Sequence, residues 1–150
     1  MIARFRTLIR DRRGSVVIET AFVLPVLATL AFGGFEVSRI VARNNELQAA
    51  AAEAATVVMA NPPEDQTDRD TIEAIVEAST GLATDKITMR QRFRCNADTL
   101  LVAAAASCAT GAEISEFIEI RMQDSYTPIW TSFGIGNTIN FDITRRVQVS

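Results

Sequence analysis

One long apolar run near the N-terminus dominates the hydropathy of the chain. Residues 15–35 include fourteen Ala, Val, Ile, Leu or Phe residues, and Glu19 is the only residue among them that carries a charge. A helix of this length spans about 30 Å, which is the hydrocarbon thickness of a bilayer. The run therefore predicts a transmembrane helix over 15–35.

The helical pattern continues beyond this run. Apolar or small residues recur at alternating steps of three and four, as on a helix face that packs against a partner. Pro62 and Pro63 end the pattern, because proline lacks a backbone donor and restricts the residue before it. We expect one helix over 15–60, bent at Pro25, whose ring clashes with the preceding turn. The expected contact face consists of Val37, Ile40, Asn44, Leu47, Ala51, Ala54 and Val58.

A shorter helix is expected next. Asp70, with Glu73 three residues later, resembles a capping box, and Gly81 is the expected C′ residue. These signals predict a helix over 70–80.

Three later segments alternate apolar and polar residues with the period of a β-strand. They lie at 87–95, 118–123 and 139–149, and each has one apolar face. Such strands form an antiparallel sheet that is covered on one side. The expected fold class is α+β: a long N-terminal transmembrane helix that continues into a small, pilin-like head with a second helix and a three-stranded antiparallel sheet.

Charge is distributed unevenly along the chain. Residues 1–14 hold five Arg and one acidic residue, whereas the remainder holds 10 basic and 17 acidic residues. An excess of basic residues before a span orients the N-terminus toward the cytoplasm. A removable secretory signal ending near 31–33 is the alternative. We expect a basic cytoplasmic leader at 1–14, the transmembrane helix at 15–35, a periplasmic continuation of the helix at 36–61 and an α+β periplasmic head at 62–150.

Two short motifs at the apolar run carry a resemblance to a known family. The basic leader ends in Gly14, and the apolar helix that follows has Glu19 as its fifth residue, which resembles the processing site of type IV prepilins. The continuation through Pro25 and the later Gly33-Gly34-Phe35-Glu36 is similar to the start of TadE-like pseudopilins of the tight-adherence (Flp) pilus system. The resemblance covers residues 12–36.

The resemblance implies a function in pilus assembly. A prepilin peptidase would cut after Gly14 and leave Ser15 as the mature N-terminus. Glu19 would then pair with the new α-amino group on a neighbouring subunit or on its own chain. The implied protein is a minor pseudopilin of the bacterial inner membrane, with a periplasmic head. Its implied partners are membrane lipid, the prepilin peptidase, other pilin-like subunits and the pilus assembly machinery.

Two alternatives stay open at this point. The competing interpretation of the whole chain is an uncleaved, membrane-anchored periplasmic binding or scaffold protein. Glu19 would then be a carboxylate tolerated near the membrane interface, about one turn inside the helix, where its side chain extends toward water.

The two cysteines, Cys95 and Cys108, fall in the part of the chain expected outside the cytoplasm. An oxidising compartment favours a disulfide between them. Two free buried thiols or half of a metal site are the alternatives. Since the chain has no His and no third Cys, the metal alternative is weak.

A basic strand face has two interpretations. Arg90, Arg92 and Arg94 alternate with apolar residues and so share one side of a strand. Contact with anionic lipid or an acidic neighbour is one interpretation. We favour a solvated sheet face with cross-strand partners that include Glu119 and Asp142.

An uncharged segment near the C-terminus contains the only Tyr and the only Trp of the chain, with Tyr126, Trp130 and Phe133 as candidate interface residues. It folds back on the core as a lid, or it forms a subunit-contact or membrane-interface patch, where Trp and Tyr are enriched.

Catalysis is not expected. The chain lacks His, which excludes Ser-His and Cys-His nucleophilic sites, and it has no paired-carboxylate or Gly-rich phosphate motif. No metal, cofactor or small-molecule substrate is expected, and an acidic, extracytoplasmic head argues against nucleic-acid binding. The acidic cluster lacks the central Gly of a calcium loop, which favours helix-start chemistry for Glu64, Asp65, Asp68 and Asp70.

Overall fold

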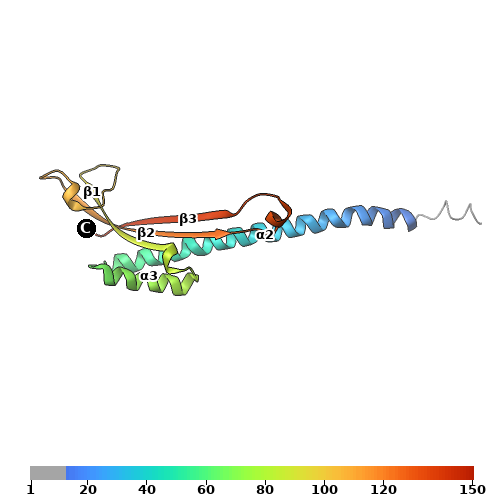
Figure 1. The fold of residues 1–150 in the computed structure, drawn as a ribbon, viewed down its shortest axis with the longest axis horizontal. Helices are drawn as coiled ribbons and strands as arrows, with labels where there is room; N and C mark the ends of the chain where they lie inside the picture. Colours follow the sequence, from blue (N-terminus) through green and yellow to red (C-terminus); the bar gives the residue numbers. More distant parts are fainter. Residues whose placement is uncertain (1–12) are drawn as a thin grey trace, which may run out of the picture. The chain divides into compact units, whose positions relative to one another are not determined.

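The computed structural model describes residues 13–150, so the basic leader expected at 1–14 lies outside the described residues except for its last two positions. The chain falls into two compact units, one ending at Arg39 and one covering Ile40–Ser150. The second unit is called the head below. The main elements are helices α2 (Arg13–Ala60) and α3 (Gln66–Thr80) and strands β1 (Ile87–Cys95), β2 (Ile114–Tyr126) and β3 (Ile139–Gln148) (Figure 1).

Helix α2 runs without interruption from Arg13 to Ala60, with Pro25 inside it. The carbonyl of Pro25 also accepts a hydrogen bond from the Thr29 hydroxyl one turn later. The expected long helix is therefore present and begins two residues earlier than predicted. The bend at Pro25 stays a prediction.

The three strands form an antiparallel meander in the order β1-β2-β3. In the register, Ile87 lies opposite Met122 and Cys95 lies opposite Ile114, while Tyr126 lies opposite Ile139. β2 is thus the central strand, and it is longer at both ends than its alternating segment. The α+β fold class is confirmed.

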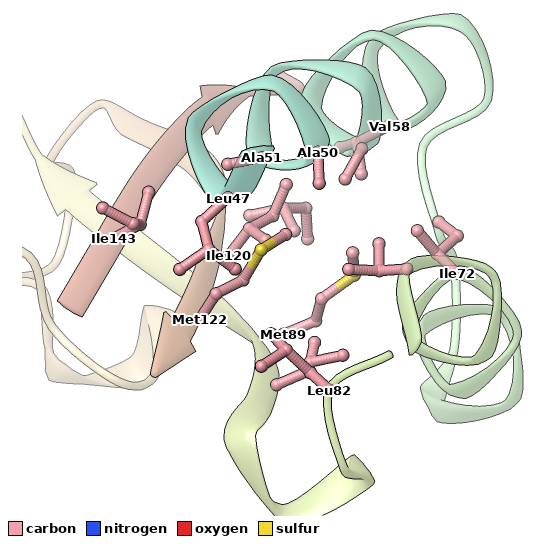
Figure 2. Packing of buried hydrophobic residues seen from close by; sticks show 14 of the residues in the cluster. Leu47, Ala50, Ala51, Val58, Ile72, Leu82, Met89, Ile120, Met122 and Ile143 are labelled. Carbon is pink, nitrogen blue, oxygen red and sulfur yellow. The ribbon is translucent and has the colours of Figure 1, made fainter. Parts of the chain in front are cut away.

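The core of the head lies between the helices and the apolar face of the sheet (Figure 2). Leu47 of α2 and Ile120 and Met122 of β2 are completely buried. Small side chains on α2 let the sheet approach closely, since alanine adds only a methyl group to the helix surface. The other buried apolar residues of the core are Ala50, Ala51, Ala54, Val58, Ile72, Val76, Leu82, Ile87, Met89, Ile118, Phe141, Ile143 and Val147.

Two expectations about the helices are corrected. α3 begins at Gln66, four residues before the predicted start, because Asp65 is the N-cap and its carboxylate accepts a 2.9 Å hydrogen bond from the Asp68 backbone N–H. Glu73, expected in a capping box, accepts instead from the Met89 backbone N–H on β1. The predicted contact face of α2 is also too long, because Val37 is 52% exposed.

Candidate functional site: the anchor helix and the head surfaces

The apolar part of α2 presents its side chains outward on all sides. Val17, Phe22 and Phe32 are 66–75% exposed, and the most apolar window of the helix has no buried residue. A helix that is apolar all round needs an apolar solvent. Its length and composition fit a single-pass membrane anchor.

Hydroxyl side chains within and just after this segment are satisfied by the helix itself. The Thr20 hydroxyl donates to the Val16 carbonyl at 2.8 Å, and the Ser38 hydroxyl donates to the Gly34 carbonyl at 2.8 Å. Such bonds to the preceding turn remove the need for water. These polar residues are therefore compatible with a lipid environment.

Glu19 is the one charged residue of the apolar run at 15–35. Its side chain is exposed, and no hydrogen bond or ion pair joins it to the side chains of residues 16–150. Gly14 and Ser15 belong to the first turn of α2. Ser15 and Glu19 are four residues apart on α2, which is about one helical turn. The structure thus places the two candidate processing residues one turn from the candidate assembly residue.

A polar cluster that the sequence did not reveal joins the elements of the head near the start of its helix. The Arg43 Nε atom donates to Asp124 at 2.6 Å, and its Nη1 atom donates to the Thr80 carbonyl at 3.0 Å and lies 2.9 Å from Glu46. Burial opposes the charge of Arg43, but the bonds to Asp124 and Glu46 raise the pKa of its guanidinium. One side chain therefore connects α2, β2 and the end of α3.

The basic strand face carries partners on the neighbouring strand. Glu119 of β2 lies 3.4 Å from Arg92 of β1 and 2.7 Å from Arg146 of β3. Arg94 stacks over the ring of Phe117 at 5.1 Å. Glu119 is thus the carboxylate shared by both outer strands.

Asp142, the second expected partner of the basic face, does not reach it. Because β3 does not neighbour β1, Asp142 binds Arg121 of β2 instead. That part of the expectation is wrong.

Cys95 and Cys108 are joined by a disulfide, with Cα atoms 5.4 Å apart. Val102, inside the closed loop, exchanges backbone hydrogen bonds of 2.9 and 2.7 Å with Phe93 of β1. At the start of the loop, Asn96 adopts positive φ, and its side chain accepts from the Glu113 N–H at 2.9 Å. The loop is thus attached to the sheet at several points.

The uncharged aromatic segment divides into a buried and an exposed part. Tyr126 ends β2 and packs against the core, and Pro128 is fully buried. The 3₁₀-helix η3 (Ile129–Phe133) follows, with Trp130 half-buried and Phe133 78% exposed. The first part therefore acts as the expected lid, and the second part is open to the surroundings.

No group of three or more potential metal ligands occurs in the part of the chain that the structure describes. The acidic cluster instead organises the start of α3: the Asp65 carboxylate accepts from the Asp68 N–H, and the Asp68 carboxylate accepts from the Glu64 N–H at 3.1 Å.

The chain thus combines one long apolar helix, which fits a single-pass membrane anchor, with a small α+β head. Residues 14–56 match the model of the family described as TadE-like protein. Comparisons with curated proteins and with solved structures give no match. The family is consistent with involvement in a tight-adherence (Flp) pilus system, and its members are structural and assembly proteins rather than known enzymes.

The carboxylate of Glu119, which both outer strands share, makes the free energy of unfolding of the head depend on pH. Burial favours the neutral acid, but hydrogen bonds from Arg146 and the charges of Arg146 and Arg92 outweigh it and lower the pKa of Glu119. A lowered folded-state pKa stabilises the fold above the unfolded value of about 4.3, and this contribution is lost as pH falls through the folded value. Glu119→Gln should therefore cost up to about 1 kcal/mol at pH 7 and less at pH 3.

Urea unfolding of the full chain in detergent, followed by Trp130 fluorescence, measures this difference. Glu113→Gln, at an exposed position just before the same strand, is the matched control and should change stability at neither pH. A cost for Glu119→Gln that is the same at both pH values would contradict the role of its charge.

The disulfide predicts that neither cysteine is a free thiol in the exported protein. Protein exported from the cytoplasm should resist alkylation at Cys95 and Cys108 until it is reduced, as mass spectrometry would detect. Closing a loop of this size stabilises the fold by about 3 kcal/mol in the chain-entropy model, so reduction should lower stability by that order. Two alkylatable thiols in unreduced, exported protein would defeat the prediction.

Proposed function

We propose that this protein is a minor pseudopilin of the bacterial inner membrane, processed by a prepilin peptidase after Gly14, that acts in the assembly of a tight-adherence pilus. The observation that carries the proposal is the placement of Glu19. It is the only carboxylate in an otherwise apolar anchor, one helical turn after the proposed cleavage site.

Cleavage would change the electrostatics of that turn. It creates an α-amino group on Ser15, a cation with an ordinary pKa of about 7.7–8.0. A charged side chain inside a bilayer costs about 2.5–3.5 kcal/mol on insertion scales, and less near the interface. Pairing Glu19 with an amine offsets part of this cost, because the two charges attract strongly where the dielectric constant is low.

The same pairing would select neighbours. An amine on the same chain lies one turn away, whereas an amine on another subunit approaches only when two helices pack in a defined register. The interaction between chains therefore favours one axial offset of the anchors. That property is what a subunit of a helical assembly needs.

The distribution of arginines around the apolar run predicts how the anchor is oriented in the membrane. The five arginines of residues 1–14 exceed the two arginines, Arg39 and Arg43, that follow the apolar run. Of these two, Arg43 already binds Asp124 within the head. The head would thus lie on the periplasmic side, where disulfides form and persist.

A second candidate is an uncleaved anchor for a periplasmic scaffold. It is favoured by one observation: the peptide bond between Gly14 and Ser15 lies within α2 rather than in an extended segment. Against it, the N–H groups of a first helical turn have no partners in the helix, so this turn opens at low cost. We therefore retain processing as the leading proposal.

The state of the N-terminus separates the two candidates. Protein purified from native membranes should begin at Ser15, as determined by intact mass and N-terminal peptide analysis. Gly14→Leu should leave full-length protein, because a peptidase at this bond needs an unhindered backbone. Gly34→Leu is the matched control: it is the same substitution on the same helix, in open space, and processing should be normal. A wild-type chain that retains Met1 would favour the uncleaved anchor.

Glu19→Gln tests the assembly role. The variant keeps the size and a hydrogen-bonding group but loses the charge. It should insert, be processed and fold, yet lose co-purification with other pilin-like subunits and lose pilus formation. Glu53→Gln, an exposed position on α2 within the head, should assemble like the wild type. Normal assembly by Glu19→Gln would show that this carboxylate is merely tolerated at the interface.

A further inference from the structure

The connection between β2 and β3 forms an apolar tip on an otherwise charged head. From Ser125 to Phe141 the chain carries no charged residue. Within this stretch, Ile129, Phe133 and Ile135 are 59%, 78% and 64% exposed. Large apolar side chains that cluster at this exposure mark a contact surface rather than ordinary solvent-facing residues.

The tip has a defined backbone. Gly134 ends η3 with a positive φ of 74°, and Gly136 also has positive φ, at 71°. A Cβ atom at Gly136 would lie 3.3 Å from the Trp130 Nε1 atom, so the loop backbone passes closely over the indole. Trp130 thus supports the tip from its half-buried side, and Phe133 and Ile135 project outward. The residues Ile129, Trp130, Phe133 and Ile135 are called the apolar tip below.

The tip lies at the end of the head where α2 enters it (Figure 1). Asp124 of β2 binds Arg43 of α2, three residues into the head. From Asp124, the strand continues for two residues to Tyr126, about 7 Å further in the same direction. Ile40, Tyr126 and Ile139 also pack against the core. The pair between Arg43 and Asp124 therefore sets the end of the β2–β3 hairpin beside the first turn of α2 in the head.

Chain length fixes how far this end is from the anchor. The apolar run ends at Phe35, and Ile40 follows five residues later on the same continuous helix, a rise of about 7.5 Å. The headgroup layer of a bilayer is about 5–7 Å thick on each side of the hydrocarbon. Whatever the angle between the two units, Ile40 is therefore no further from the hydrocarbon than about the thickness of that layer.

The geometry points to a second membrane contact: the apolar tip inserts into the headgroup region of the bilayer that holds the anchor. The inference rests on the membrane anchoring within the proposed function but not on processing or assembly. Burying Phe133 and one neighbouring aliphatic side chain in the interface adds favourable transfer free energy. Trp130 suits this depth, because an indole combines an apolar ring with one N–H donor.

Lipid is favoured over a second copy of the chain by the position and chemistry of the tip. A protein interface of this kind carries a polar rim and hydrogen-bonding pairs. The tip instead offers exposed apolar side chains and no charge. The head is joined to the anchor by the few residues between Phe35 and Ile40, so lipid is within reach of the head without any assembly step.

The only Trp of the chain makes a direct reporter. The full chain is reconstituted in phosphatidylethanolamine–phosphatidylglycerol vesicles whose acyl chains are brominated either near the headgroup or near the methyl end. Trp130 emission should be blue-shifted and should be lost with bromine near the headgroup, with a smaller loss for deep bromine. Equal emission in brominated and unbrominated vesicles would overturn the inference. Emission that changes with the protein-to-lipid ratio but not with bromination would overturn it as well.

Two variants sharpen the test. Phe133→Asp should abolish the quenching by brominated lipid, because a carboxylate is expelled from the interface. Leu100→Asp makes the same kind of change at a position that is 79% exposed, in the disulfide-closed loop at the other end of the sheet, and should leave the quenching intact. Equal quenching in both variants would overturn the role of the tip.

Vesicle flotation is measured in parallel for each variant. Flotation depends on the anchor alone, so failure to float would overturn the membrane anchoring itself. Flotation without quenching of Trp130 would overturn only the tip contact.

Discussion

The head depends on the close packing of a three-stranded sheet against one stripe of α2. The stripe combines Leu47 and Val58 with the alanines between them, and it is matched by the apolar face of β2. A single sheet of this size is marginal in water without a cover. α2 provides most of that cover with Leu47, Val58 and the alanines between them, and α3 extends it with Ile72 and Val76.

α2 also forms the anchor, so the composition of this one helix suits lipid in its first part and water in its second part. From Val16 to Phe35 its side chains are apolar on all sides apart from Glu19 and a few hydroxyls, and the Thr20 hydroxyl bonds to the helix backbone. From Ile40 onward one apolar stripe is buried, and charged groups such as Arg43 and Glu46 occur among the remaining positions. The change in pattern occurs within a few residues. It marks the place where the environment of the helix changes, and it requires no break in the backbone.

Local patterns explain why most of this fold could be predicted from the sequence. The period-two alternation predicted the bounds of β1, because a strand with one face on the core and one face in solvent alternates apolar and polar residues. The start of α3 was missed because Asp65 and Asp70 are both good N-caps, and only the bond to the Asp68 N–H decides between them. The Arg43–Asp124 pair was missed because it joins positions that are 81 residues apart, which no local pattern connects. Likewise, the sequence identified the aromatic segment but not which of its residues are buried, because that depends on where the hairpin meets α2.

The position of β3 along the chain has a consequence for the order of folding. Phe141, Ile143 and Val147 of β3 belong to the core, yet they are made after every other described element. Until they emerge, the alanine stripe of α2 is incompletely covered and β2 has an open edge. Both features promote association between incomplete chains. A nascent head is therefore prone to association with other incomplete chains until β3 has been synthesised. An apolar start of α2 that is held in the membrane would keep such chains at the membrane surface during that interval.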